Sequence, residues 1–116
     1  MVAQKLELTD EQVNRIFRAL ADATRRDIVR RTLTAEASIS ELAADYDMSF
    51  AAVQKHVAVL EAADLVARFP RGRERIIRGN PETIRRAQQL LSHFEQIWRG
   101  RVDRLDAMFA AEDTEH

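Results

Sequence analysis

The sequence predicts a mainly α-helical fold that carries one small β-hairpin. The composition supports this fold, because a chain of 116 residues with three glycines and two prolines has few tight turns. Apolar residues recur at helical spacing along most of the chain, whereas residues 65–78 contain two short strand-like runs. With 46% hydrophobic and 32% charged residues, we expect one globular domain over residues 1–116.

The first predicted helix begins after Thr9, which forms a capping box with Gln12. Its apolar positions recur at i, i+3, i+4 and i+7, and they are Val13, Ile16, Phe17 and Leu20. Asp22 is the expected N-cap of a second helix, whose apolar positions are Ile28, Val29 and Leu33. The segment TAEAS, residues 34–38, breaks the periodicity and is expected to be a loop.

Residues 39–62 are predicted to form two helices joined by a short turn, which is the signature of a helix-turn-helix. The first is ISELAADYD, with Ser40 as its cap; its inward positions are Leu42, Ala43 and Tyr46. Met48 lies in the turn, and Ser49 caps the second helix, FAAVQKHVAVLEAA. That helix starts with small and polar residues and continues with an apolar stripe. This pattern is typical of a DNA-reading helix, and also of an amphipathic helix with a polar first turn.

A basic hairpin follows the two helices. LVARF and ERIIR read as strands and PRGR as the turn between them, so residues 65–78 form the predicted wing of a winged helix-turn-helix. Asn80 and Pro81 then supply an N-cap and a first-turn proline for the fifth and last helix, over residues 81–110. Residues 111–116 are expected to be a frayed tail.

The last helix carries more apolar surface than one small domain needs. Ile84, Leu91, Trp98 and Leu105 are seven residues apart, and Phe94 and Met108 lie three residues after two of them. We expect the fold to dimerise through its first and last helices. The predicted interface residues are Val13, Ile16, Phe17, Leu91, Phe94, Trp98 and Leu105. The alternative is that this stripe closes the core of a monomer.

Four segments in this order resemble the ArsR/SmtB-type family of winged-helix repressors. FRALADATRRDIVRRTL is similar to the family's second helix, SISELAADYDMSFAAVQKHVAVLEAADLV to its helix-turn-helix, and RFPRGRERIIRGNPE to its wing. The end FEQIWRGRVDRLDAMF is similar to a cysteine-free branch. Asp64 stands where a glycine is usual, and Asp tolerates the left-handed conformation. Gln54 stands where a serine is common, so no operator sequence can be borrowed from the family.

The charge distribution favours double-stranded DNA as a partner. The chain has a net charge of −1, but Lys55 to Arg78 contains six bases and three acids. The first turn of the second helix must enter a groove about 12 Å wide, which suits the small side chains of Ser49, Ala51 and Ala52. Gln54 can pair with adenine, and Lys55 can reach a guanine or a phosphate.

Two further side chains of this helix have open roles. Phe50 can touch a thymine methyl group or pack on the preceding helix, and the second role is favoured. His56 can donate to a phosphate, form a hydrogen bond inside the protein or bind a metal, and the first two roles are favoured.

Arg71, Arg73 and Arg75 are the predicted DNA contacts of the wing. Alternation along the returning strand is expected to place Arg73 and Arg75 on one face, where they would bind phosphates or a narrow minor groove. The alternative is a solvated hairpin whose charges serve solubility.

Other classes of function receive little support. Without cysteines, and with His93 as the only histidine of the last helix, we expect no metal and no cofactor. No nucleophile set or glycine-rich phosphate loop indicates an enzyme. No apolar stretch reaches membrane-spanning length and no signal segment is recognised, so we expect a cytoplasmic protein with no membrane partner.

The sequence therefore predicts a homodimeric, sequence-specific DNA-binding transcriptional regulator. By resemblance to the family it is expected to be a repressor. The two recognition helices of the dimer are expected to read the half-sites of a near-palindromic operator, and the protein's own gene is a candidate target. An effector, if one exists, would be a small apolar ligand or a protein partner. The alternative function is a winged-helix protein-interaction module without sequence-specific DNA binding.

Overall fold

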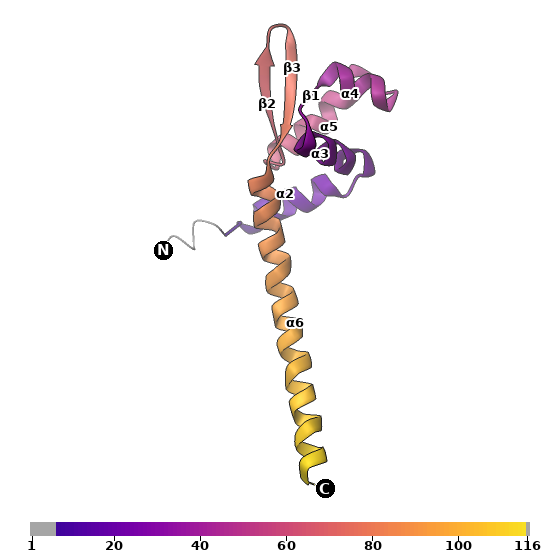
Figure 1. Ribbon diagram of the computed structural model, residues 1–116. Coiled ribbons are helices and arrows are strands. Elements are labelled where there is room, and N and C mark those ends of the chain that lie inside the picture. The colour runs from indigo at the N-terminus through magenta and orange to yellow at the C-terminus, as the bar shows by residue number, and fades with distance from the viewer. Residues whose placement is uncertain (1–6, 116) are drawn as a thin grey trace.

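The computed structural model describes the backbone of residues 7–115 and the side chains of residues 7–112. Five helices and three strands occur in this part of the chain (Figure 1), which confirms the predicted mainly α-helical fold with five helices and a β-hairpin. In chain order they are α2 (Asp10–Leu20), α3 (Ala23–Thr34), β1 (Ala37–Ser38), α4 (Ile39–Tyr46), α5 (Phe50–Ala62), β2 (Val66–Arg71), β3 (Glu74–Gly79) and α6 (Pro81–Glu115). The helix-turn-helix is α4 and α5, and β2 with β3 forms the wing.

Most of the predicted helix starts are confirmed. The capping box of Thr9 and Gln12 is formed at α2, and the Asp22 carboxylate accepts the Arg25 amide at the start of α3. Ser49 caps α5, and the Asn80 side chain accepts the Glu82 amide at the start of α6. At each of these positions the cap and its partner are at most three residues apart, so the local sequence contains the whole interaction.

Two local predictions are wrong. Ser38, and not Ser40, is the N-cap of α4, where it forms a capping box with Glu41. The last helix does not end at residue 110 but continues through Glu115, because residues 111–115 contain no glycine or proline that would stop it.

The sheet contains a strand that the sequence analysis had placed in a loop. β1 pairs antiparallel with β3, with Ala37 opposite Ile77 and Ser38 opposite Ile76, and the strand order is β1-β3-β2. A two-residue strand is too short to produce a periodic pattern, so its partner in β3 decides its conformation.

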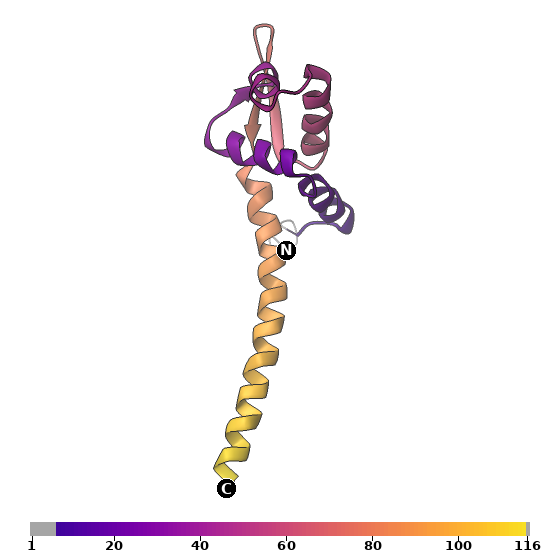
Figure 2. The same cartoon turned by 90° about the vertical axis from the view of Figure 1, so that its right-hand side faces the viewer.

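The core lies where α2, α3, α4 and α5 meet the base of the sheet (Figures 1 and 2). Its largest fully buried side chains are Ile16, Ile28, Ile39, Leu42, Leu60, Leu65, Ile77, Val53 and Val57. Each helix contributes residues from one face, which follows from the apolar spacing. Leu33, which the spacing placed inward, is 41% exposed.

Gly79, at the end of β3, is required because the hairpin approaches α3 closely. A Cβ atom at this position would lie 2.8 Å from the backbone nitrogen and the Cγ of Leu33. We expect Gly79→Ala to lower the free energy of unfolding by about 1–3 kcal/mol, because backbone must move. Gly100→Ala in α6 is the control: its Cβ would approach only the end of the Arg104 side chain, at 3.4 Å, and alanine favours a helix by about 0.5–1 kcal/mol. Urea denaturation measures both, and equal midpoints for the two variants would contradict the close approach.

α6 leaves the body of the protein and extends alone into solvent in both views (Figures 1 and 2). The radius of gyration is 20.4 Å, whereas a compact chain of this length has about 13 Å. Within residues 7–115 no helix is both long enough and apolar enough to cross a membrane.

Candidate DNA-binding surface

α5 is anchored by one face and offers the other to solvent. Val53, Val57 and Leu60 are fully buried, while Ala51 and Lys55, four residues apart, lie on the opposite, exposed face. The helix starts at an exposed N-cap, Ser49, whose hydroxyl oxygen accepts the Ala52 amide at 3.1 Å. Beside Phe50, the first turn of α5 therefore offers only the small side chains of Ala51 and Ala52.

The remaining predicted contacts of α5 flank this exposed face. Ala52, Gln54 and His56 are half-buried. Phe50 is 48% exposed, so about half of its surface is covered by the protein and both of its expected roles stay open. An aromatic ring at the entrance of the helix is available for contact with another molecule.

His56 forms a hydrogen bond inside the protein. Its Nδ1 lies 3.4 Å from a guanidinium nitrogen of Arg25 and 4.0 Å from the Asp22 carboxylate. Because a guanidinium can only donate, Nδ1 is the acceptor in the contact with Arg25. Arg25 is held by the carbonyl oxygens of Ala19 and Arg18 and thereby links the end of α2 to α5. The sequence analysis missed Arg25, whose His56 contact is separated by 31 residues.

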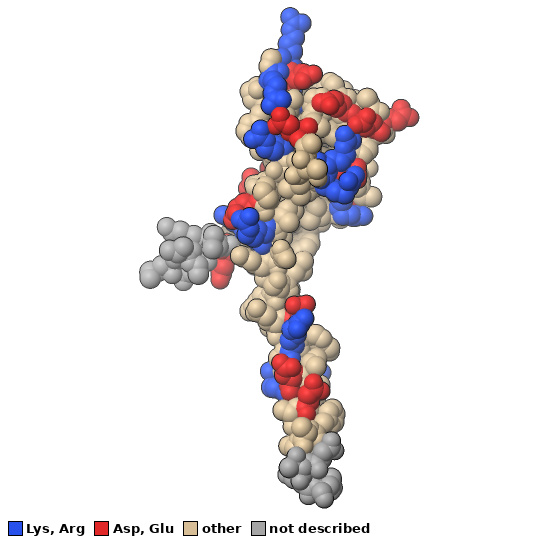
Figure 3. Space-filling view, viewed as in Figure 1, with Lys and Arg blue, Asp and Glu red and all other residues tan. Residues whose placement is uncertain are grey.

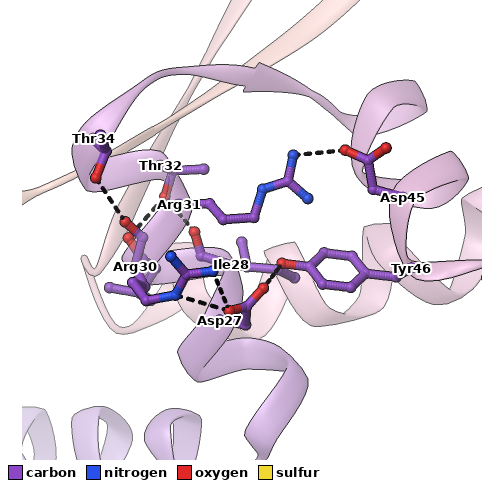
Figure 4. A network of polar contacts seen from close by, with 9 residues as sticks. Asp27, Ile28, Arg30, Arg31, Thr32, Thr34, Asp45 and Tyr46 are labelled. Atoms are coloured by element: carbon purple, nitrogen blue, oxygen red, sulfur yellow. Dashed lines mark hydrogen bonds and ion pairs between the residues drawn. The ribbon is translucent and has the colours of Figure 1, made fainter.

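The turn between α4 and α5 is fixed by backbone and side-chain contacts. Asp47 adopts the left-handed conformation, with φ 53°, and the Met48 amide donates to the Ala43 carbonyl. Just before the turn, the Tyr46 hydroxyl donates to the Asp27 carboxylate of α3 at 2.5 Å (Figure 4). The Tyr46 hydrogen bond lowers the pKa of Asp27, and Arg30 lowers it further by binding the other carboxylate oxygen. Asp27 is therefore an anion that ties α4 to α3.

We expect Tyr46→Phe to lower the midpoint of thermal unfolding by about 3–6 °C, because the Asp27 carboxylate loses a donor in a partly buried position. The change keeps the ring, and hence the Arg31 guanidinium 5.3 Å above it. Differential scanning calorimetry measures the shift. Asp45→Asn, which removes the 2.7 Å contact of Asp45 with Arg31 at an exposed position, should change the midpoint less; the reverse order would show that the Tyr46 bond does not hold α4.

The wing is a hairpin with a two-residue turn. Gly72 and Arg73 connect Arg71 to Glu74, and Gly72 has φ 62°, as the first position of a type II′ turn requires. Arg73 therefore lies at the tip and not in the returning strand, so the predicted alternation with Arg75 does not apply. Among the described residues neither Arg73 nor Arg75 forms an ion pair or side-chain hydrogen bond.

Arg71 differs from these two arginines. The register puts Arg75 on the same strand face as Arg68, which contacts Glu61 of α5 at 3.3 Å. Arg71 shares the opposite face with Arg78, and both bind the carboxylate of Glu36. The sequence analysis missed Glu36, which precedes β1 and lies 35 residues from Arg71 in the chain. No local pattern connects the two.

Charge is unevenly distributed over this surface (Figure 3). Basic side chains mark the tip of the hairpin, while exposed acids, Glu41, Asp45 and Asp47, belong to α4 and the turn after it. The tip of the hairpin is therefore the more favourable place for a polyanion. Within the described residues, no group of three or more His, Asp or Glu side chains could hold a metal ion.

Of the predicted interface residues, all except Ile16 lie at the surface. Leu91, Phe94, Trp98 and Leu105 of α6 are 53%, 57%, 59% and 41% exposed, and Phe17 of α2 is 41% exposed. Val13 is half-buried. The prediction is wrong for Ile16. This side chain is 1% exposed in the core of the chain, so it offers no surface to a second copy. The prediction combined neighbouring positions of one helical stripe, and the structure divides that stripe between core and surface.

Comparison with known proteins identifies this arrangement. A helix-turn-helix domain family matches residues 15–68. The chain is 37% identical to the HTH-type transcriptional regulator Rv2034 of Mycobacterium tuberculosis over 81 residues, which are 70% of this chain and 76% of that protein.

Solved structures agree with the sequence match. A crystal structure of an ArsR family transcriptional regulator has 32% identity and a TM-score of 0.74, covering 80% of this chain and 96% of its own. An ArsR-like transcriptional regulator from Rhodococcus sp. RHA1 has 28% identity and a TM-score of 0.75, covering 84% of this chain and 92% of its own. The chain belongs to the ArsR-type family of winged helix-turn-helix transcriptional regulators and carries their helix-turn-helix DNA-binding domain.

Proposed function

We propose that the protein acts as a homodimeric repressor that binds a near-palindromic operator. The apolar surface of α6 carries this proposal. Beyond Leu90, seven large apolar side chains of this helix are at least 41% exposed: Leu91, Phe94, Ile97, Trp98, Leu105, Met108 and Phe109. A helix that projects alone with such a stripe needs a partner to bury it. Its seven-residue spacing matches the packing of two helices along each other.

The first helix adjoins this stripe. A groove of about 610 Å³ runs between the start of α2 and α6, and its apolar lining is Leu8, Val13 and Leu90. A second copy that packs on α6 would extend over this groove and also cover the exposed Phe17 ring. In this proposal α2 contributes Val13 and Phe17 to the dimer interface, but not Ile16.

Two-fold symmetry determines how such a dimer meets DNA. Each protomer presents the small first turn of α5 to the major groove and the arginines of its wing to the backbone or the minor groove. The two α5 helices read half-sites about 34 Å apart, so the operator has the same two-fold symmetry as the protein. Occupation of such a site in a promoter excludes polymerase, which is how the protein represses without an enzymatic activity.

The test of the function is fluorescence anisotropy on DNA from upstream of the protein's own coding region, with unrelated DNA of equal length as the control. Binding at least about 10³-fold tighter to the upstream DNA would support a sequence-specific, autoregulatory repressor. Equal and strongly salt-dependent binding to both would contradict autoregulation. No binding to either DNA would contradict DNA binding altogether and favour a protein-interaction module.

The DNA-contact residues can be separated by their effects. Arg73→Ala and Arg75→Ala should weaken binding to both DNAs. Each should lower the slope of log affinity against log salt by about 1.8 for the bound dimer, because each of the two protomers loses one phosphate contact. Gln54→Ala should instead remove about 1–3 kcal/mol of discrimination at one base pair. Salt titrations and a panel of single-base operator variants measure the two effects. A Gln54 variant with unchanged base preference would remove Gln54 from the reading surface.

A further inference from the structure

Glu36 lies between the body and the wing, in the two-residue connection that follows α3. Its carboxylate binds two arginines from different strands. Oε1 accepts from Arg71 of β2 at 2.6 Å, and Oε2 accepts from Arg78 of β3 at 2.8 Å and 3.3 Å. The Glu36 side chain is 31% exposed, whereas those of Arg71 and Arg78 are 61% and 55% exposed. Glu36 is thus the more buried centre of a three-residue cluster on one face of the hairpin.

The two arginines are held unequally. Arg78 makes two hydrogen bonds to Glu36, and its guanidinium lies 4.7 Å from the centre of the Phe69 ring, within range of a cation–π interaction. Arg71 makes one hydrogen bond, nearer the tip of the hairpin. Arg78 therefore fixes the position of the Glu36 carboxylate, while Arg71 is the arginine that can exchange this carboxylate for another anion.

A DNA phosphate is such an anion. A wing that enters a minor groove about 6 Å wide has a phosphate backbone on each side, so arginines on both faces of the hairpin come near phosphates. Arg73 and Arg75 are available for these contacts at once, whereas Arg71 must first leave Glu36. The arginine hydrogen bonds, that of Arg78 first and that of Arg71 second, hold the pKa of Glu36 below its ordinary value. Glu36 is therefore an anion at neutral pH and repels phosphates even when Arg71 has moved.

We propose that Glu36 is an intramolecular competitor of DNA, which keeps Arg71 off the phosphate backbone and so limits the protein's affinity for non-target sequences. The inference rests on the proposed DNA binding and adds a residue that limits the electrostatic contribution to DNA affinity. Non-specific binding depends on the number of phosphates that are neutralised, and a genome offers very many competing sites. A protein whose wing has fewer free arginines therefore occupies these non-target sites less.

The test is the affinity of the full-length protein for a random-sequence 30-base-pair duplex, measured by anisotropy from about 50 to 200 mM salt. Glu36→Gln should raise the affinity roughly 3- to 10-fold at the lowest salt and steepen the log–log slope by about 1.8, the effect of one added phosphate contact in each protomer of the dimer. Glu95→Gln is the matched control, because it makes the same charge change and releases Arg99, 3.4 Å away, on the projecting part of α6. An increase no larger than that of Glu95→Gln would overturn the inference.

Arg71→Gln, made alone and together with Glu36→Gln, completes a double-mutant cycle. In the wild-type background it should leave the slope nearly unchanged, and in the Glu36→Gln background it should return the slope to the wild-type value. Equal effects of Arg71→Gln in both backgrounds would overturn the inference, since Arg71 would then bind phosphate despite Glu36. A decrease in affinity for Glu36→Gln would overturn it as well and leave Glu36 with a purely structural role. If the wild-type protein bound neither this duplex nor its upstream DNA, the proposed function itself would fail, before any variant is compared.

Discussion

Replacement of Leu91 and Trp98 by glutamate should convert the protein from a dimer into a monomer at micromolar concentration. The two side chains are 53% and 59% exposed on the same stripe of α6, seven residues apart. Because the proposed interface is two-fold symmetric, it contains each substitution twice, once from each protomer. A buried tryptophan anchor typically contributes at least about 2 kcal/mol, so the two copies of Trp98→Glu alone should raise the dissociation constant about 10³-fold.

The folded monomer should be little affected by the same change. Both side chains are more than half exposed in the single chain, and glutamate is a good helix former. Sedimentation velocity at about 10 µM gives the mass, and far-UV circular dichroism gives the helix content. Gln96→Glu is the control, because Gln96 is exposed and lies on the opposite side of the helix from Leu91 and Trp98.

DNA binding provides a second readout of the same variant. When two half-sites are bound by one dimer, the second contact is intramolecular, and its loss costs about 10²- to 10⁴-fold in affinity for the whole operator. The doubly substituted monomer should therefore bind a single half-site as well as a complete operator. Wild-type protein that already sediments as a monomer at this concentration would contradict the dimer, and with it the two-half-site geometry.

The parts of the fold that were predicted correctly depend on short-range interactions. Thr9, Asp22, Ser49 and Asn80 each cap a helix through a partner two or three residues away. Asp64 was expected to take the left-handed conformation in place of a glycine, and its φ is 58°. Such positions can be found from sequence because the whole physical interaction fits within one turn of chain.

The parts that were missed depend on partners far away in the sequence. β1 exists because β3 pairs with it, and Arg71 is neutralised because Glu36 folds back against the wing. A pattern of charges shows that arginines are present, but it does not show which of them are already bound. For the same reason the three wing arginines looked equivalent in the sequence, whereas the structure separates Arg71 from Arg73 and Arg75.

In the two helices of the proposed interface, the spacing of apolar residues showed which residues share a face but not which neighbour each of them contacts. It grouped Val13, Ile16 and Phe17 into one stripe, but the structure buries Ile16 and exposes Phe17. A stripe about 100° wide can meet two different neighbours, and its spacing alone does not assign each residue to one of them. In α6 the same spacing continues well beyond the body, so that there the exposure of the side chains, and not their periodicity, indicates a missing partner.

Ala51→Glu should reduce operator affinity by at least about 100-fold while the protein stays folded. Ala51 is exposed in the first turn of α5, where a carboxylate interacts favourably with the positive end of the helix dipole. The thermal unfolding midpoint should therefore stay the same or rise. In the groove the same side chain is unfavourable for two reasons. It is too long for close approach of the helix, and its charge meets the negative potential of the DNA.

The contrast between stability and binding makes this variant informative. Gln88→Glu adds the same charge at an exposed site of α6 and serves as the control for the change in net charge. If α5 is the reading helix, Ala51→Glu should lose most of its operator binding, whereas Gln88→Glu should retain nearly all of it. If both variants bound the operator as tightly as the wild-type protein, the first turn of α5 would lie outside the groove. The DNA contacts would then have to come from the wing alone, and Gln54 and Lys55 could not determine the sequence that is bound.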